Sequence, residues 1–454
     1  MIQPSRLQNL NDTPLPTPGH HVLYWMQASQ RTRFNHALEH AIATANSQKK
    51  PLVVCFGLTD NYPEANARHY AFMLQGLRDV AASLAKRRIK FVLKHGSPPD
   101  VALHYAKHAS HLICDRGYTR HQKRWRDQVA DQARCPVTEV ESDVVVPIEA
   151  ASDKQEYAAR TIRPKITRLL SEYLHALPEK KIAIPSLDLN IKGDLDPSDP
   201  DKLLAKLKLD RSVPPVPAHF IGGQSAAAKR LSTFLSQKLS HYHTARNQPS
   251  ANHTTTLSPY LHFGQISPLD IALQISNSPA PAADRESLLE ELIIRRELAC
   301  NFVHYSPHYD TYAGLPSWAQ KTLREHSRDP RPNLYTLAQL ESASTHDPYW
   351  NSAQREMLLT GYMHNYMRMY WGKKILEWSP TPESAYAAVL HLNNKYFLDG
   401  RGPNAFTNVA WLFGLHDRPW GPPRPIFGLI RYMNSAGLTR KFDMDAYVAI
   451  VNAL

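Results

Sequence analysis

The first third of the chain alternates short apolar runs with longer segments of helical periodicity. The helix-like segments include "NHALEHAIATANSQ" and "RHYAFMLQGLRDVAASLAKRR". Strand and helix alternating at this spacing predict βαβ units around a parallel sheet. Because such crossovers are right-handed, the expected architecture is a doubly wound α/β domain. The expected strands are "HHVLYWMQ", "PLVVCFGLT", "IKFVLKHG", "HLICDRGY" and "VTEVESDVVVP".

A change of composition divides the rest of the chain. Between about residues 184 and 223, Pro, Asp and Lys are frequent, which predicts a long surface linker with one helical turn. Beyond it strand signals nearly vanish, and apolar residues follow helical spacing. We therefore expect an α/β domain over residues 1–183, a linker over 184–223 and an all-helical domain over 224–454.

The whole-chain composition narrows the function classes. A net charge of +12 favours a polyanionic partner, nucleic acid first. No run approaches the ~18 apolar residues of a membrane span, and the N-terminus predicts a short polar arm leading into the first strand. The four cysteines include no C-x-x-C pair and predict buried free thiols. Neither "HALEH" nor "HYH" offers a third ligand group, so no metal site is expected.

Three of the eight tryptophans lie in one segment, "DPYWNSAQREMLLTGYMHNYMRMYWGKKILEW". Its opening "DP" predicts a helix that ends near Gly361, and a second helix is expected from about Tyr362 to Trp378. On the second helix Arg368, Trp371 and Trp378 share a face, with the two indoles roughly 10 Å apart. Core packing explains a single Trp, but a buried cation on the same stripe needs a partner. This helix face therefore favours an electron-transfer chain of indole side chains.

Several long motifs resemble those of one family, the DNA photolyases and cryptochromes, and the likeness is greatest to the class II cyclobutane pyrimidine dimer photolyases. The resemblance covers nearly the whole chain, domain order included. It implies light-driven repair of DNA, in which excited, reduced and anionic FAD donates an electron to a dimer that has been flipped out of the duplex. The motifs are "TTTLSPYLHFGQISP", "EELIIRREL", "THDPYWNSAQREM", "YMHNYMRMYWGKKILEW", "LNNKYFLDGRGPN" and "GLHDRPW…FGLIRYMN".

The resemblance implies a set of FAD contacts in the helical domain. Hydroxyls and backbone N–H groups at a helix start suit the flavin phosphates. Arg368 is expected beside the flavin ring with Asp399 as its partner. Asn393 is expected to face the flavin N5 atom, and Asn404 is the alternative. The remaining implied contacts are Tyr242, Arg246, Thr254, Thr255, Thr256, Leu257 and Ser258.

The resemblance also gives the three tryptophans an order. Trp371 matches the indole closest to the flavin, Trp350 the intermediate one and Trp378 the distal one. Tyr335 extends this chain as an extra donor. The three indoles are therefore expected to carry electrons between the cofactor and the surface.

A further set of implied contacts faces the substrate. Glu291 matches the carboxyl group that hydrogen-bonds the dimer, and Glu290 is the alternative. Arg246 and Asn247 match a pair inserted where the flipped dimer left the duplex. The implied apolar pocket walls and phosphate contacts are Met369, Trp411, Arg418 and, more weakly, Arg431.

Two other functions stay open beside repair. One is a cryptochrome-like flavin photoreceptor without repair activity, although the short end "RKFDMDAYVAIVNAL" lacks a long signalling tail. The other is a nucleic-acid-binding protein that has lost the flavin. The class often carries an antenna chromophore such as a deazaflavin in the α/β domain, and no motif decides its presence. A monomer is expected, in the cytoplasm with the nucleoid or in a nucleus.

Overall fold

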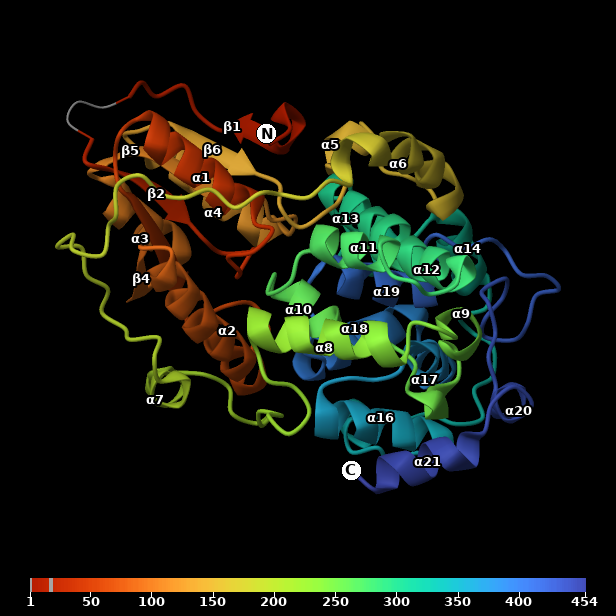
Figure 1. Cartoon of the computed structure of the whole chain (residues 1–454). Helices are drawn as coiled ribbons and strands as arrows, with labels where there is room; N and C mark the ends of the chain where they lie inside the picture. Colours follow the sequence, from red (N-terminus) through yellow and green to blue (C-terminus); the bar gives the residue numbers. More distant parts are fainter. Residues whose placement is uncertain (1, 16–18) are drawn as a thin grey trace. The chain divides into compact units, whose positions relative to one another are not determined.

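The computed structural model describes residues 2–15 and 19–454, which form two compact units (Figure 1). Within those residues no helix has the length and apolar character that crossing a membrane requires. The first unit consists of Met1–Asp153, Pro164–Ser232 and Leu257–Ser278, and the second of Lys154–Arg163, Thr233–Thr256 and Pro279–Leu454.

The first unit is built on a six-stranded sheet in the order β1-β6-β5-β2-β3-β4. All neighbouring strands are parallel except β1, which pairs antiparallel with β6. The order reverses direction beside β2, as the doubly wound prediction requires, and that prediction is confirmed. The strands are β1 (Leu7–Asn9), β2 (His21–Trp25), β3 (Leu52–Leu58), β4 (Lys90–His95), β5 (Ala109–Asp115) and β6 (Val137–Val140).

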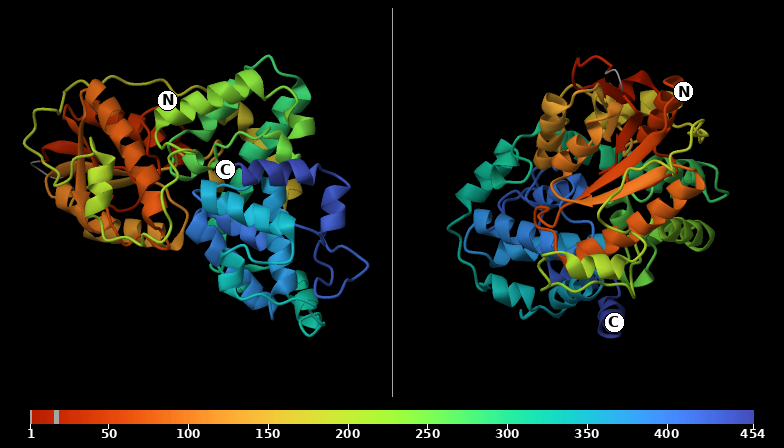
Figure 2. Two further views of the ribbon diagram at one scale, coloured as in Figure 1. Left: turned by 90° about the horizontal axis from the view of Figure 1, so that it is seen from below. Right: turned by 90° about the vertical axis from the view of Figure 1, so that its left-hand side faces the viewer.

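Helices cover both faces of this sheet (Figures 1 and 2). Val22 and Tyr24 of β2 pack with α1 and α2, whereas the alternate residues Leu23 and Trp25 pack with α3 and α4. Successive strand residues point to opposite faces, so a strand buried on both sides is apolar throughout. The helices of this unit are α1 (His36–Ser47), α2 (Ala67–Lys86), α3 (Pro98–Ala106), α4 (Arg120–Gln132), α5 (Ile148–Ala151), α7 (Pro200–Lys206), α10 (Ser258–His262) and α11 (Pro268–Ser276).

The N-terminal segment and residues 184–223 are more structured than the sequence predicted. The polar-arm prediction was wrong for Leu7–Asn9, which pair with β6 as an edge strand. Residues 184–223 contain the single expected helix, α7, and lie along the first unit. Leu203 joins the core beside α2, and the Ser186 hydroxyl accepts the Lys90 N–H at 2.7 Å.

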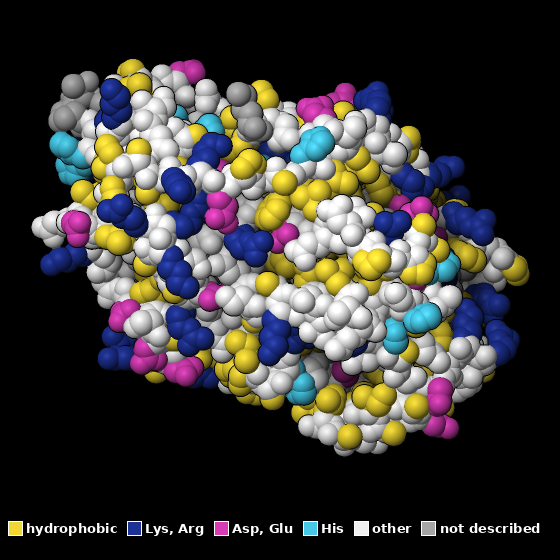
Figure 3. Space-filling view, in the orientation of Figure 1, with side chains coloured by type: hydrophobic (Ala, Val, Ile, Leu, Met, Phe, Trp, Pro, Cys, Tyr) yellow, Lys and Arg dark blue, Asp and Glu magenta, His cyan; other side chains and the backbone are white. Residues whose placement is uncertain are grey.

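The second unit is helical, as predicted, and its helices α16 to α19 pack on one another. Lys and Arg side chains are spread over the face of the molecule in Figure 3. Helices α6 (Ala159–Tyr173) and α8 (Gln224–Gln237) each have residues in both units. The other elements of the second unit are α9 (Tyr242–Ala245), α12 (Ala282–Leu289), the π-helical η3 (Glu290–Arg295), α13 (Arg296–Tyr305), α14 (Ser317–Glu325), α15 (Leu337–Glu341), α16 (Pro348–Thr360), α17 (Asn365–Trp378), α18 (Pro382–Tyr396), α19 (Pro403–Leu412), α20 (Ser435–Thr439) and α21 (Met444–Asn452).

Candidate active site

The pair of helices that carries the tryptophans is joined by one carboxylate. Asp347 caps α16 by accepting the backbone N–H groups of Tyr349 and Trp350, each at 3.0 Å. Its other oxygen accepts the phenolic O–H of Tyr370 on α17. Gly361 ends α16 with a φ of 73°, in the left-handed region that glycine adopts readily. The predicted end of this helix is therefore confirmed.

A histidine starts the second helix. The Nδ1 atom of His364 accepts the backbone N–H of Tyr366 at 3.2 Å, so Nε2 carries the proton and donates to the Arg246 carbonyl at 3.0 Å. Burial lowers the pKa of His364 to about 4, which keeps the imidazole neutral. Because His364 has a non-helical ψ of 137°, α17 begins at Asn365 rather than at Tyr362.

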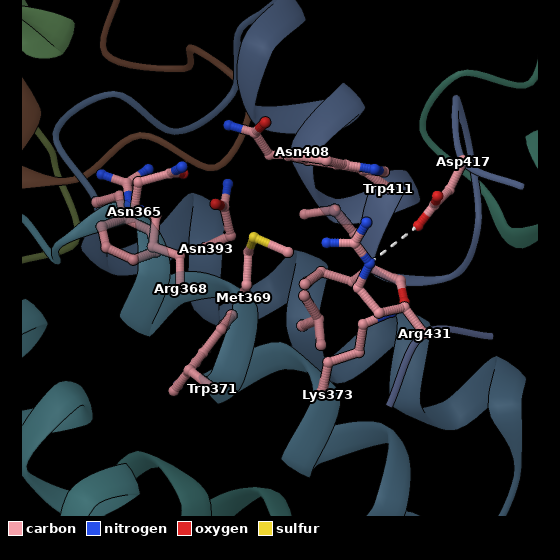
Figure 4. Close-up of a pocket in the computed structure, with 14 residues that line it drawn as sticks. Asn365, Arg368, Met369, Trp371, Lys373, Asn393, Asn408, Trp411, Asp417 and Arg431 are labelled. Carbon is pink, nitrogen blue, oxygen red and sulfur yellow. Dashed lines mark hydrogen bonds and ion pairs between the residues drawn. The ribbon is translucent and has the colours of Figure 1, made fainter. Parts of the chain in front are cut away.

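A pocket lies beside α17 (Figure 4). Arg368 and Asn393 lie toward one end, Asp417 and Arg431 toward the other, and Met369 lies between them. The wall therefore combines cations and amides with aromatic and aliphatic side chains. It is lined by Asn365, Arg368, Met369, Trp371, Lys373, Val389, Asn393, Phe397, Asn408, Val409, Trp411, Leu412, Asp417 and Arg431.

The predicted partner of Arg368 is in place. Its two terminal nitrogens donate to the two carboxylate oxygens of Asp399, each at 3.0 Å. The Arg368 Nε donates to the Met363 carbonyl at 3.0 Å, and its guanidinium lies 3.9 Å from the centre of the Phe397 ring. A two-pronged pair with little exposure holds the guanidinium in one orientation at the pocket wall.

Of the two asparagines considered for one role, the pocket contains only Asn393 among its described lining residues. Its Nδ2 donates to Asn394 Oδ1 at 3.0 Å, which fixes the plane of its amide. Asn394 in turn accepts the backbone N–H of Arg401 at 3.0 Å. Asn404 lies near the start of α19, outside the pocket lining. Asn408, which sequence reasoning missed, lines the wall instead.

The three tryptophans are buried and close together. Trp350 Nε1 donates to the Trp371 carbonyl at 2.9 Å, and the ring centres of Trp350 and Trp378 are 5.6 Å apart. Tyr335 lies edge-on to Trp378 with a ring-centre distance of 5.3 Å. Trp371 itself lines the pocket and donates its N–H to Gln354 at 2.8 Å. Trp371 therefore lies at the pocket, Trp350 of α16 contacts it, and Trp378 of α17 lies beside Trp350.

The threonine segment is unusual in its backbone. Thr256 has a φ of 49°, a left-handed conformation that a β-branched residue rarely adopts. The Thr254 hydroxyl is hydrogen-bonded to the Tyr362 hydroxyl at 3.0 Å. On the segment between Arg246 and Thr254, the buried Gln248 Oε1 has no hydrogen-bond partner among the described residues. Leu257 and Ser258 follow in the first unit, where α10 begins.

Glu291 and Arg246 form an ion pair at 2.9 Å. Glu291 lies in η3, where the helix widens to π geometry, a feature that often accompanies function. The Arg246 guanidinium also lies 5.6 Å from the centre of the Tyr242 ring. The neighbouring Glu290 is engaged elsewhere, with Arg163 at 2.7 Å. Asn247 beside Arg246 is exposed.

The far end of the pocket carries a second group of predicted residues. Trp411 lines the pocket together with the central Met369, and Arg431 reaches Asp417 at 3.5 Å. The guanidinium of Arg431 lies 4.3 Å from the Trp420 ring centre. Arg418 is exposed outside the pocket lining and also stacks near Trp420.

Comparison with known proteins identifies the family. Residues 22–183 match the family model described as DNA photolyase. The chain is 51% identical to the deoxyribodipyrimidine photo-lyase of Methanothermobacter thermautotrophicus, over 100% of this chain and 99% of that one. The protein of the same name from Arabidopsis thaliana is 40% identical, over 100% and 94% of the two chains. The chain belongs to the DNA photolyase family.

The solved structures agree with this membership at the level of the fold. A class III photolyase from Agrobacterium tumefaciens superposes with a TM-score of 0.73 at 19% identity, covering 95% of this chain and 86% of that one. The photolyase from Potorous tridactylus is 39% identical in sequence, over 96% of this chain and 82% of its own. The fold and family expected from the motifs are therefore confirmed.

Several residues of this photolyase-family site were missed from the sequence. Lys373 is buried in the pocket wall and donates to the Leu412 carbonyl, and burial lowers its pKa to about 7. In "WGKKILEW" a lysine pair resembles a solvated helix face, so only the tertiary packing shows that Lys373 is buried. Asp417 and Asn408 gave no local signal either. His364 lies four residues before Arg368, and this helical spacing is the one sequence signal of its position.

Glu356 on α16 predicts a pH-dependent stability. Burial raises its pKa from 4.5 to about 7, against the opposing hydrogen bond from Tyr447 at 2.6 Å. The fold favours the neutral carboxyl group of Glu356. Its contribution to the free energy of unfolding is therefore complete below pH 4.5 and is lost as pH rises through about 7. Thermal unfolding should show a loss on the order of 1–3 kcal/mol between pH 5 and 8.

Glu356→Gln should remove most of that dependence and be more stable than the parent at pH 8. The exposed Glu325→Gln on α14 is the control and should leave the pH profile unchanged. Equal pH profiles for the parent and Glu356→Gln would show that the carboxyl group ionises freely in the fold.

Proposed function

We propose that this chain is a light-driven deoxyribodipyrimidine photo-lyase that splits cyclobutane pyrimidine dimers in DNA. The observation that carries the proposal is the full-length likeness to proteins named for that activity, at 51% identity for one of them. The pocket beside Arg368, Asn393 and Trp371 supports it, since one site there offers a cation, an amide and an indole.

The donor set fits FAD in its family role. The strained Thr256 and the hydroxyls of Thr254 and Thr255 would hold the phosphates, and the unpaired Gln248 Oε1 is an acceptor that a ligand group can satisfy. Arg368, fixed by Asp399, would stabilise negative charge on the ring system. Tyr242, Arg246, Leu257 and Ser258 complete the proposed contacts.

When bound and reduced, FAD supplies on excitation the electron that breaks the cyclobutane ring. The protein's own residues do the rest. Asn393 presents an amide of fixed plane at the pocket wall, without the negative charge of a carboxylate. Trp371, Trp350 and Trp378 relay electrons inward from the surface to restore the reduced state.

The DNA-facing roles follow from charge and shape. Positive charge on the chain favours the phosphate backbone. We propose that Glu291 hydrogen-bonds the dimer, that Met369 and Trp411 wall the pocket, and that Arg418 contacts phosphate. Arg431 would contact phosphate from the same end of the pocket.

A repair assay tests the whole function. The purified protein, reduced in dithionite, should restore thymine dimers in an oligonucleotide to thymines under near-ultraviolet or blue light and leave them intact in darkness. Flavin bands in its absorbance spectrum should accompany this activity. Binding of flavin without any illuminated repair would favour the photoreceptor alternative.

Arg246 and Glu291 make one prediction about substrate. Their ion pair must open if Arg246 fills the space of the flipped bases. Arg246→Ala should therefore weaken binding of dimer-containing duplex DNA by about 1–3 kcal/mol, the range for a charge-assisted hydrogen bond. A single-stranded substrate leaves no space to fill, so the loss there should be smaller. Binding isotherms on matched oligonucleotides measure both.

Glu291→Ala should instead lower the repair yield per photon more than it lowers affinity, because its hydrogen bond gains strength as the dimer becomes charged. Exposed Arg440→Ala and neighbouring Glu290→Ala are the matched controls. An equal Arg246→Ala loss on single and double strands would leave only a general phosphate contact.

Finer features are also part of the proposal. Class II membership rests on the motif resemblance, and the division into residues 1–183, 184–223 and 224–454 rests on the change of composition along the chain. An antenna such as a deazaflavin would add a violet absorbance band beyond those of FAD. We expect a monomer that acts wherever the cell keeps its DNA.

A further inference from the structure

The outer end of the tryptophan array meets a tyrosine–histidine pair. The Tyr335 hydroxyl and His346 Nδ1 are 2.6 Å apart, and the His346 backbone N–H donates to the same phenolic oxygen at 3.0 Å. The two rings are nearly parallel at 18°. Since the phenolic oxygen already accepts the backbone N–H, its own proton points to the imidazole.

Both rings of the pair touch the last indole. The Trp378 ring centre is 5.3 Å from Tyr335 and 5.2 Å from His346. The backbone N–H of Tyr335 also donates to the Trp378 carbonyl at 3.2 Å, which ties the tyrosine to the indole. Trp378 is buried, Tyr335 is half-buried and His346 is exposed. The contacts therefore lead from the interior to the solvent.

The charge around Trp378 favours moving a positive hole outward. The ammonium of Lys374 lies 5.6 Å from the indole ring, and a cation at that distance opposes oxidation of the ring. Glu377 pairs with Lys374 at 2.7 Å and reduces this effect without removing the cation. When the oxidised residue is a neutral tyrosyl radical next to a solvated imidazolium, no positive charge remains on Trp378 beside the Lys374 ammonium.

We propose that His346 is the proton acceptor that allows Tyr335 to reduce oxidised Trp378. One electron passes from the phenol of Tyr335 to the Trp378 radical cation, and the O–H proton passes to His346 Nδ1. The products are neutral Trp378, a neutral Tyr335 phenoxyl radical and an imidazolium. A thiolate from solvent then returns an electron to the phenoxyl radical, and the imidazolium returns the proton.

Proton transfer across a preformed short hydrogen bond gives the step its direction. Without a base, oxidised tyrosine would have to keep or shed a very acidic proton, whereas the imidazole takes it within the existing contact. The exposed imidazolium is then stabilised by water. This step rests on the proposed function, because the hole on Trp378 originates at a light-excited oxidised flavin.

Flash-induced transient absorption and electron paramagnetic resonance on the flavin-loaded protein test the pair. In the parent, a tryptophan radical signal should convert to a tyrosyl signal, and conversion should slow measurably in deuterated water. Tyr335→Phe should lose the tyrosyl signal and lengthen the tryptophan signal. His346→Ala should lower the tyrosyl yield several-fold, and added imidazole should restore it.

The exposed His308→Phe is the matched control and should leave both signals unchanged. A tyrosyl signal of normal yield in His346→Ala would overturn the role of His346. Loss of yield that imidazole does not restore would also overturn it, since a structural defect would then explain the change. Absence of any tryptophan radical in the parent would instead overturn the electron path and, with it, the support that path lends to the proposed function.

Discussion

Arg368→Ala should leave the protein with little or no bound flavin after purification. The guanidinium is the one cation fixed by two hydrogen bonds at this end of the pocket lining, through Asp399. Its loss removes positive charge from the proposed ring site and strands a carboxylate with 12% exposure, so the site becomes repulsive to an anionic ring. Flavin released on denaturation, per mole of protein, measures occupancy, which should fall at least several-fold.

Breaking a buried ion pair is destabilising, so the folding of Arg368→Ala must be measured separately from its flavin content. Stability losses of about 3–5 kcal/mol are typical when one partner of such a pair is removed. Circular dichroism should still report a helical protein, and the exposed Arg355→Ala on α16 should keep full occupancy. The double variant Arg368→Ala, Asp399→Ala separates the two effects, because it removes the stranded carboxylate but still lacks the cation. Full, photoreducible occupancy in Arg368→Ala would remove this residue from the cofactor site.

Trp371→Phe should abolish the light-driven reduction of oxidised bound flavin. Trp371 is the indole of the array that lines the pocket, and a phenyl ring is far harder to oxidise than an indole. Repair by enzyme that has been reduced chemically beforehand should largely survive, since that electron travels from flavin to dimer. Bleaching of the flavin band under steady illumination with a thiol donor measures the first activity, and dimer splitting measures the second.

The substitution also leaves the buried Gln354 without its donor, at a cost of about 1–3 kcal/mol. Trp318→Phe on α14 is the control, because the N–H of Trp318 has no hydrogen-bond partner among the described residues. It should photoreduce normally. Photoreduction at the parental rate in Trp371→Phe would show that electrons enter by another route.

Much of the fold could be predicted because its signals are local. The central strands β2 and β3 are buried along their whole length, so each appears in sequence as an apolar run. The edge strand Leu7–Asn9 was missed because it is short and polar, and only its pairing with β6 makes it a strand. Residues 184–223 show the same limit, since their packing along the first unit leaves no periodic pattern.

The candidate site divides in a similar way. Long irregular motifs predicted the Arg368–Asp399 pair, and the structure contains it. Lys373 could not be predicted, because nothing in a lysine pair shows that both side chains are buried or that Lys373 lines the pocket. The ion pair between Arg246 and Glu291 joins residues 45 positions apart, so helical spacing could not predict this contact. The π geometry at Glu291 likewise depends on packing rather than on local propensity.

The shared carboxylate of Asp347 has a consequence for timing. Electron tunnelling between aromatic rings falls off exponentially with the gap, so small fluctuations in spacing change the transfer rate greatly. Asp347 anchors the first turn of α16 at Trp350 and also holds Tyr370, one residue before Trp371. Any shear between the two helices must first break these bonds. These bonds therefore hold the spacing of the proposed electron path constant.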